Sequence, residues 1–317
     1  MQTICLIGGT GFLGGHLLKM LGKQDLFKVK ILSRKSNTQL SHFKKACLVL
    51  GDMLDENSLI TFLEPGSIVI NAAYMGDRLH EDNLKGTFNL AGSCDKVGVT
   101  RLIHISTAVV VGRVSENVIT EVTRCKPVTQ YEKAKLDIEN ALLSSLSKRC
   151  QVTIVRPTEV FGKGGKGLLK LVNALTSGSP LINDLKKSLY SRRRLNLVCV
   201  DNVVAAIGFL ISTEKDVDRQ CFIISDDEAE ENNYYDVVTL LAESLGMDRA
   251  PRAFFECPPL ILSAMLWMAG RSNTNPYRVY SCEKLLRLGF RKPVSFRDGL
   301  KRFEDWYKST RTGTLPT

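Results

Sequence analysis

Short, continuous apolar runs alternate with segments of helical periodicity over the first half of the chain. An uninterrupted apolar run is typical of a strand that is buried on both faces, as in a parallel sheet. Such runs occupy residues 3–7, 27–32, 46–50, 67–73, 101–107 and 152–157. Helical patterns lie between them at 14–21, 83–96 and 131–147. The alternation predicts an α/β fold built on a doubly wound parallel sheet.

The pattern changes after Pro157, where glycine-rich loop sequence replaces the regular alternation. Two later apolar runs, 195–200 and 221–225, are predicted to return to the sheet, and prolines punctuate the remainder of the chain. We therefore expect two domains, with these bounds: a first over 1–160 with returning segments near 195–225, and a small lobe formed mainly by 161–317.

The longest apolar stretch is CPPLILSAMLWMAG, at residues 257–270. It is shorter than the roughly 20 residues that a helix needs to cross a bilayer, so no membrane span is expected. We expect a packed helix of the small lobe here. Contact with a membrane surface and a cover over an apolar ligand are the alternatives.

A glycine-rich turn follows the first apolar run, in ICLIGGTGFLGG at residues 4–15. Gly8, Gly11 and Gly14 are spaced three apart between a predicted strand and a predicted helix. Without Cβ atoms, these positions allow a tight turn, the approach of a pyrophosphate and close packing of helix on strand. The helix N-terminus favours an anion. The turn therefore predicts a Rossmann-type dinucleotide site, and a tight turn that binds nothing is the alternative.

The second predicted strand indicates which dinucleotide is bound. An acidic residue at its end holds the ribose 2′-hydroxyl of NAD, whereas an arginine accommodates the 2′-phosphate of NADP. The strand ends in ILSRK, with Ser33 and Arg34 and no acidic residue. NADP(H) is therefore favoured over NAD(H), unless Arg34 is only a solvated charge. Asp52, after the third strand, is placed to reach the adenine amino group.

Tyr131 and Lys135 lie four residues apart on a predicted helix, so their side chains leave the same face. An ammonium beside a phenol is expected to lower the tyrosine pKa, so that the phenol can exchange a proton near neutral pH. Ser106 and Thr107 end an apolar strand at the sheet edge where ligands bind. A hydroxyl there can polarise a carbonyl or hold an alcohol. The pattern indicates proton-transfer chemistry beside the dinucleotide.

The formal net charge is +10 among 317 residues. Nucleic acid, anionic lipid or an anionic small substrate could each explain it. Because no nucleic-acid-binding motif is present and the basic residues are dispersed except at Arg192–Arg194, phosphate-bearing small ligands are favoured over nucleic acid. The nine cysteines form no CxxC pair, so neither a disulfide framework nor a metal site is expected. These features, with no signal-peptide pattern, indicate a cytoplasmic protein.

Taken in order, these motifs resemble those of the extended short-chain dehydrogenase/reductase family. The matching segments are GGTGFLG (8–14), GDMLD (51–55), INAA (70–73), NLKGTFNL (83–90), HISTAVVVG (104–112), YEKAK (131–135), VRPTEVFGKG (155–164) and a late pattern of Gly289, Phe290, Gly299, Leu300, Trp306 and Tyr307. The resemblance spans nearly the whole chain. It implies an NAD(P)-dependent epimerase, dehydratase or reductase of nucleotide sugars, with a small C-terminal substrate-binding lobe and a homodimer that includes the Tyr131 helix.

The resemblance also implies roles for single residues. Thr107, Tyr131 and Lys135 would be catalytic, and Thr107 is preferred over Ser106 because it stands five residues before Gly112. Asn83 would be a structural asparagine. The implied cofactor contacts are Gly8, Thr10, Gly11, Phe12, Leu13, Gly14, Ser33, Arg34, Asp52, Met53, Asn71, Ala72, Ala73, Lys135 and Pro157. The implied step is hydride transfer with proton exchange by Tyr131.

Some positions depart from the family pattern. Ala108 and Val109 follow Thr107 where 4,6-dehydratases carry Asp and Glu, so that reaction is not expected. Glu159 stands where many sugar-nucleotide members carry Asn, and it would repel a diphosphate. Arg192–Arg194 could compensate, or could be a solvated loop.

The first functional hypothesis is a 4-keto reductase or a 4-epimerase of a nucleotide-activated sugar, and Arg34 favours the reductase. The second is a reductase or dehydrogenase of an apolar substrate, such as a sterol, a flavonoid or an acyl thioester; HISTA (104–108), LNLVCVDNV (195–203) and the apolar 258–270 segment favour it. The third is a dinucleotide-binding sensor without turnover, which the presence of both Tyr131 and Lys135 disfavours.

Overall fold

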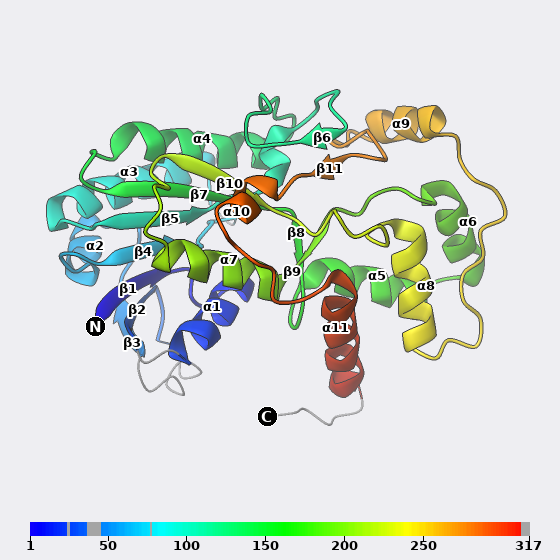
Figure 1. Cartoon of the computed structure of the whole chain (residues 1–317), viewed down its shortest axis with the longest axis horizontal. Coiled ribbons are helices and arrows are strands. Elements are labelled where there is room, and N and C mark those ends of the chain that lie inside the picture. Colours follow the sequence, from blue (N-terminus) through cyan, green and yellow to red (C-terminus); the bar gives the residue numbers. More distant parts are fainter. Residues whose placement is uncertain (24–25, 37–45, 77, 312–317) are drawn as a thin grey trace. The chain divides into compact units, whose positions relative to one another are not determined.

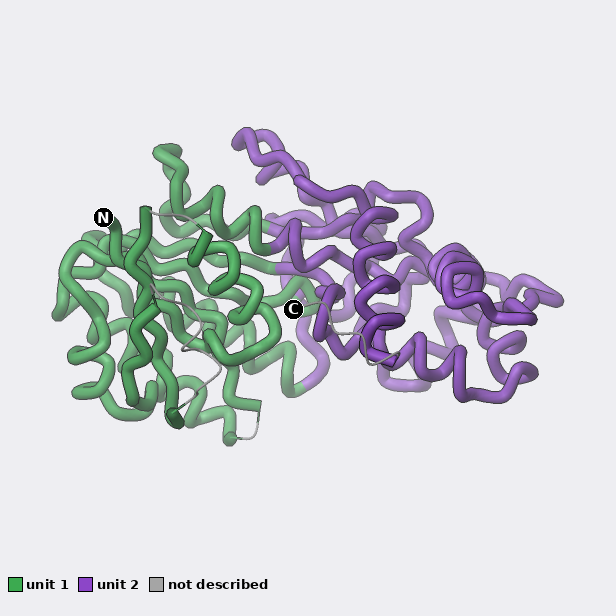
Figure 2. Tube along the Cα trace, turned by 90° about the horizontal axis from the view of Figure 1, so that it is seen from below, with its two compact units in different colours: residues 1–110, 130–156, 204–222 green, residues 111–129, 157–203, 223–317 purple. Residues whose placement is uncertain are grey.

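The computed structural model describes residues 1–23, 26–36, 46–76 and 78–311. The chain divides into two compact units, which Figure 2 colours separately. The first comprises residues 1–110, 130–156 and 204–222, and the second comprises residues 111–129, 157–203 and 223–317.

A seven-stranded sheet forms the centre of the first unit, in the order β10-β7-β5-β4-β1-β2-β3. Its strands are β1 (Gln2–Ile7), β2 (Phe27–Ser33), β3 (Ala46–Leu50), β4 (Ile68–Asn71), β5 (Arg101–Ile105), β7 (Gln151–Pro157) and β10 (Gln220–Ile224). The five pairs from β7 through β3 are parallel. All six expected strands of the first half are confirmed, and residues 221–225 return to the sheet edge as predicted.

Helices cover both faces of this sheet, which confirms the doubly wound architecture (Figure 1). They are α1 (Phe12–Gly22), α2 (Glu56–Phe62), α3 (His80–Val97), α4 (Gln130–Ser145) and α7 (Val200–Ser212). The side chains of successive residues in each strand point to opposite faces of the sheet. Cys5 and Ile7, for example, join a buried cluster with Leu90 of α3 and Ile138 of α4.

A buried ion pair holds α4 against the sheet. Arg156, near the end of β7, donates from Nε to Oε1 of Glu139 at 3.0 Å and from Nη2 to Oε2 at 2.6 Å. Such paired N–H···O bonds fix direction as well as distance. Because α4 also carries Tyr131 and Lys135, this pair sets the position of both side chains relative to the carboxyl ends of the strands.

The second unit is mostly helical, around a core that includes Phe161, Val172 and Phe303. Its helices are α5 (Lys166–Ser177), α6 (Pro180–Tyr190), α8 (Tyr234–Ser244), α9 (Pro259–Met268), α10 (Glu283–Arg287) and α11 (Phe296–Arg311). Two small parallel sheets pair β6 (Val118–Ile119) with β11 (Val279–Tyr280) and β8 (Glu159–Phe161) with β9 (Leu197–Cys199).

One sequence expectation about the second unit is wrong. Residues 195–200 do not rejoin the main sheet, because β9 pairs with β8 instead. The apolar stretch 257–270 forms the expected packed helix, α9, which is buried at Leu262 and Leu266 and exposes most of its other large side chains. Among the described residues, no helix combines the length and apolar character needed to cross a membrane.

Candidate active site

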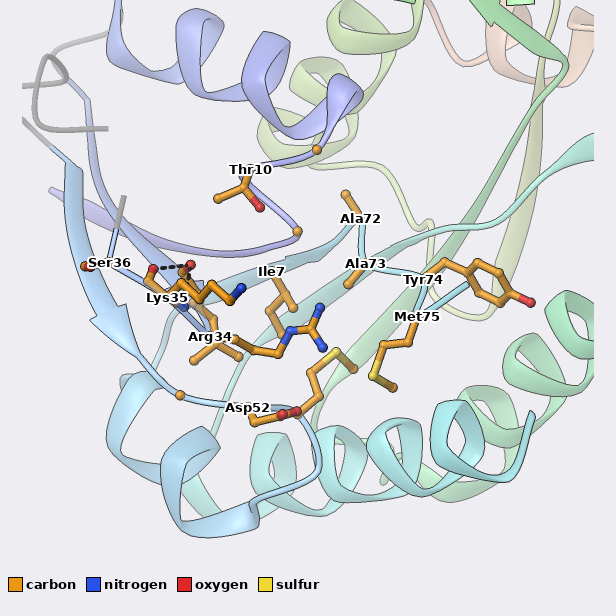
Figure 3. Close-up of a pocket in the computed structure, with 16 residues that line it drawn as sticks. Ile7, Thr10, Arg34, Lys35, Ser36, Asp52, Ala72, Ala73, Tyr74 and Met75 are labelled. Atoms are coloured by element: carbon orange, nitrogen blue, oxygen red, sulfur yellow. Dashed lines mark hydrogen bonds between the residues drawn. The ribbon is translucent and has the colours of Figure 1, made fainter. Parts of the chain in front are cut away.

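A cleft of about 560 Å³ opens at the carboxyl ends of β1, β2 and β4 in the first unit (Figure 3). Ligands of open α/β sheets bind at this edge. The lining residues come from the glycine turn, the β2 end, the β3–α2 loop and the β4 end: Ile7, Gly8, Thr10, Gly11, Leu32, Ser33, Arg34, Lys35, Ser36, Gly51, Asp52, Met53, Ala72, Ala73, Tyr74 and Met75. Nine of these are positions predicted from the sequence to hold the dinucleotide.

The glycine turn has the geometry of a phosphate cradle. Gly8 has a φ of +82°, and a Cβ there would stand 2.7 Å from the carbonyl carbon of Ala72. A Cβ on Gly14 would stand 2.1 Å from the Gly8 oxygen, so α1 packs on the turn more closely than any other residue allows. Helix α1 begins without a side-chain cap at Gly11, so its first N–H groups remain available to an anion. Phe12 and Leu13 form its first turn.

Polar groups gather where the adenosine end of a dinucleotide would lie. Figure 3 shows the Arg34 side chain extending across the cleft between Ile7 and Asp52. The Ser33 hydroxyl donates to the Lys35 carbonyl at 2.7 Å, which shapes the strand end. Asp52 accepts the Leu54 N–H at 3.0 Å. These residues fit a dinucleotide, and the exposed guanidinium fits a 2′-phosphate.

Two buried asparagines hold the segment after β4 that lines the cleft. Asn71 ends β4, and its Oδ1 accepts the Ala73 N–H at 3.1 Å. Asn83 accepts the Met75 N–H and donates to the Met75 carbonyl, both at 3.0 Å. The turn that carries Tyr74 is therefore held from both sides by side-chain hydrogen bonds, and the contacts of Asn83 are structural.

Tyr74 connects the two residues predicted to exchange the proton. Its ring meets the Tyr131 ring edge to face, with centroids 5.2 Å apart, and the Lys135 Nζ lies 5.5 Å from its centroid. Lys135 is buried and donates to the Ile105 carbonyl at 2.9 Å, where β5 ends. Thr107 follows two residues later, and its Oγ1 accepts the Val109 N–H at 3.4 Å. Tyr131 and Lys135 thus both contact Tyr74 beside the cleft, and Thr107 lies two residues beyond the carbonyl that accepts from Lys135.

The expected lowering of the Tyr131 pKa is not found. The phenol is 43% exposed, yet its pKa is raised, first by desolvation and then by the neighbouring Tyr74. The physical reason is that the Lys135 ammonium donates to the Ile105 carbonyl and lies over Tyr74. Desolvation lowers the pKa of Lys135 from 10.5 to about 8, while Glu139 acts in the opposite direction.

The depressed Lys135 pKa implies a stability cost that can be measured. Below pH 8 the folded protein carries a buried charge, and the shift from 10.5 to about 8 corresponds to roughly 3 kcal/mol. We expect Lys135→Met to raise the free energy of unfolding at pH 7, because only a hydrogen bond of about 1 kcal/mol is lost. The gain should shrink as pH rises from 8 to 10. Chemical denaturation of the wild type and of Lys135→Met at pH 7 and pH 10 measures this gain. The same difference in the free energy of unfolding at both pH values would contradict the prediction.

Two nearby side chains were missed by the sequence analysis. Tyr74 follows INAA without any pattern of its own. His104 lies fully buried on β5, in a small cavity shared with Asn71 and Asn83, and neither ring nitrogen has a hydrogen-bond partner in the described structure. Burial and the nearby Lys135 lower the pKa of His104 well below its usual range, so the ring is neutral. The only sequence signal for His104 was the presence of a histidine inside an apolar strand.

The remaining predicted positions belong to the second unit. Pro157 ends β7, and Glu159 begins β8, where desolvation raises its carboxyl pKa while Lys170 and Arg193 act against the rise. The three arginines do not act as a group. Arg192 pairs with Asp236 at 2.7 Å, Arg194 donates to the Ala229 carbonyl at 2.7 Å, and Arg193 lies 5.6 Å from the Tyr190 ring. In the described residues, no three His, Cys, Asp or Glu side chains converge to hold a metal.

Comparison with known proteins gives a family match over residues 4–223, to the NAD dependent epimerase/dehydratase family. The UDP-glucose 4-epimerase of Vibrio cholerae is 30% identical over 68% of this chain and 72% of its own length. An N-acetyl-α-D-glucosaminyl-diphospho-ditrans,octacis-undecaprenol 4-epimerase of Escherichia coli O157:H7 is 30% identical over 52% of this chain and 51% of its own. A sterol-4-alpha-carboxylate 3-dehydrogenase of Schizosaccharomyces pombe, described as decarboxylating, is 24% identical over 56% of each.

The last two matches span about half of each relative's length. Among solved structures, MoeE5 in complex with UDP-glucose and NAD has a TM-score of 0.74 at 19% identity, covering 98% of this chain and 99% of its own. That likeness confirms the fold. The chain belongs to the NAD dependent epimerase/dehydratase family, as the ordered motifs predicted.

Proposed function

We propose that this protein is an NAD(P)-dependent enzyme that acts at a keto or hydroxyl carbon of a nucleotide-activated sugar, as a 4-keto reductase or a 4-epimerase. The observation that carries the proposal is the contact of both Tyr131 and Lys135 with the Tyr74 ring, which itself lines the cleft. Proton exchange and dinucleotide binding then occur side by side. The UDP-glucose 4-epimerase relative supports the substrate class.

The roles of the residues follow from their places in the first unit. The glycine turn would hold the diphosphate of the dinucleotide, Asp52 its adenine, and Asn71–Ala73 the inner wall. The dinucleotide supplies the hydride acceptor or donor when it is bound. Tyr131 moves the proton at the sugar oxygen, and Thr107 donates a hydrogen bond to the same oxygen. Lys135 orients the site through its contacts with the Tyr74 ring and the Ile105 carbonyl.

A second candidate is the oxidation or reduction of an apolar alcohol or ketone. The sterol dehydrogenase relative favours it, as does the exposed apolar helix α9. Both candidates use the same proton-exchange residues. They differ in the group that binds beyond the reacting carbon.

For the cofactor we propose NADP(H) over NAD(H), because Arg34 extends across the adenosine end of the cleft. MoeE5, in contrast, is a complex with NAD. We also propose a homodimer that uses α4 and its neighbour α3, whose Phe88 side chain is 51% exposed. Cytoplasmic location stays a prediction.

One experiment tests the cofactor and the reaction together. The purified protein is denatured, the released dinucleotide identified, and NADPH and NADH titrated by calorimetry against the wild type and Arg34→Ser. We expect an empty site, preference for NADPH, and a loss of about tenfold in NADPH affinity in the variant with NADH unchanged. Retained NAD, with 4-epimerisation of UDP-glucose seen by NMR, would instead establish the epimerase. Turnover of a sterol and of no sugar nucleotide would establish the second candidate.

A further inference from the structure

Helix α9 exposes most of its apolar surface. Only Leu262 and Leu266 are buried; they lie one turn apart on one face and pack against Leu189 and Tyr190 of α6. On the other side, Leu260 is 85%, Trp267 60% and Met268 72% exposed. At 100° per residue these side chains span a broad arc opposite the packed face. Within a folded protein, such an arc requires an apolar partner.

Helix α6 buries polar side chains and exposes apolar ones, which is the reverse of an ordinary surface helix. Its polar residues Asp184 and Lys187 are buried, whereas Leu181, Ile182 and Leu185 are exposed. Asp184 accepts the Arg252 N–H at 2.7 Å, and Lys187 donates to the Thr239 hydroxyl at 2.8 Å. Because these hydrogen bonds hold the buried polar side chains inward, the apolar face of α6 points outward.

Helices α6 and α9 and the segment that leads from α8 into α9 belong to the second unit (Figure 1). The Phe254 N–H donates to the Ser188 hydroxyl of α6 at 2.9 Å, so Phe254 and Phe255 lie next to that helix, and both are exposed. We call the exposed apolar side chains of α6, of α9 and of this phenylalanine pair the apolar face. It joins elements that are separate in the sequence.

The charges at the edges of the apolar face indicate its partner. Residues 257–270 contain no charged side chain, and the exposed Arg252 and Arg271 stand on either side of that stretch. Glu256, next to this stretch, accepts the Ser191 hydroxyl at 3.0 Å. An apolar surface that includes an exposed tryptophan and is bordered by arginines matches the acyl and headgroup layers of an anionic membrane.

We propose that the apolar face docks the protein on an anionic lipid bilayer, with α9 lying in the plane of the interface. The helix covers about 15 Å, which suits this orientation and not a crossing. A second copy of the chain is the competing partner. A dimer formed through the apolar face would place the arginines of two chains, each of net charge +10, close together. Anionic headgroups would instead neutralise these arginines. The proposal concerns location and is independent of the proposed reaction.

Vesicle sedimentation without any substrate tests this proposal. The full chain is mixed with vesicles of phosphatidylcholine alone, or with about a third phosphatidylglycerol. We expect binding to the anionic vesicles, weakened at least about tenfold in Leu260→Gln/Trp267→Gln and also weakened in Arg252→Gln/Arg271→Gln. The matched control is Leu26→Gln/Val122→Gln, which changes two side chains that are 70% and 92% exposed elsewhere. Circular dichroism melting confirms that all variants are folded.

Three outcomes would overturn the proposal. One is wild-type protein that stays in the supernatant with both kinds of vesicle. Another is binding that the control variant loses as fully as Leu260→Gln/Trp267→Gln. The third is a wild-type dimer in analytical ultracentrifugation that only the α9 variant dissociates, since the apolar face would then belong to a second copy of the chain.

Discussion

Replacement of Tyr131 by Phe should lower kcat by about 10²–10⁴-fold, the usual contribution of a positioned general acid or base. The change removes one hydroxyl and keeps the ring, whose edge-to-face contact with Tyr74 holds the wall of the cleft. Dinucleotide affinity and the melting temperature should therefore stay within experimental error of the wild type. Steady-state kinetics with the substrate identified for the wild type, calorimetric titration and thermal denaturation measure the three quantities.

Tyr277→Phe is the matched control, because it removes the same hydroxyl from a side chain that is exposed in the second unit. Its kinetics should equal those of the wild type. If Tyr131→Phe retained full kcat, the proton would have to move through another group, and the proposed role of Tyr131 would fail.

Gly14→Ala should abolish tight dinucleotide binding and lower the free energy of unfolding. The new Cβ would stand 2.1 Å from the Gly8 oxygen and 2.7 Å from the Gly9 Cα, both backbone atoms, so either α1 moves away or the turn opens. Overpacking of this kind costs roughly 1–3 kcal/mol or more. Because an opened turn no longer aims its N–H groups at the diphosphate, affinity should fall at least about tenfold.

The neighbouring Gly15→Ala supplies the control within the same helix. No atom lies within 4 Å of the Cβ it would add. Alanine should therefore raise the free energy of unfolding by up to about 1 kcal/mol through helix propensity alone, with binding unchanged. Calorimetry and urea denaturation of the two variants test the pair, and equal behaviour would mean that the close packing at Gly14 does not shape the site.

The first half of the fold was predictable because its signals are local. Buried parallel strands are continuous apolar runs, and the glycine turn needs three residues without side chains at fixed spacing. Gly8 and Gly14 accordingly lie where the pattern placed them. The helix that carries Tyr131 and Lys135 was predictable for the same reason, since the positions of these residues on one face follow from helical geometry.

What could not be predicted depends on contacts between segments far apart in the sequence. The pairing of β9 with β8 cannot be read from the residues of either strand. The raised pKa of Tyr131 follows from burial and from Tyr74, which reaches the site through a turn held by Asn83. The outward apolar face of α6 contradicts the usual rule of burial, because partners such as the Thr239 hydroxyl satisfy its buried polar side chains.

The division of the chain has a consequence for work with fragments of the gene. The polypeptide passes between the two units five times, after residues 110, 129, 156, 203 and 222. A product truncated near residue 160 would lack β10, which borders β7. The Val152 N–H would lose the Asp218 carboxylate, and the Val152 carbonyl would lose the Arg219 N–H. The exposed edge of β7 could then pair with strands of other chains, which promotes aggregation. The nucleotide-binding half therefore cannot be expressed, shuffled or fused as one continuous cassette.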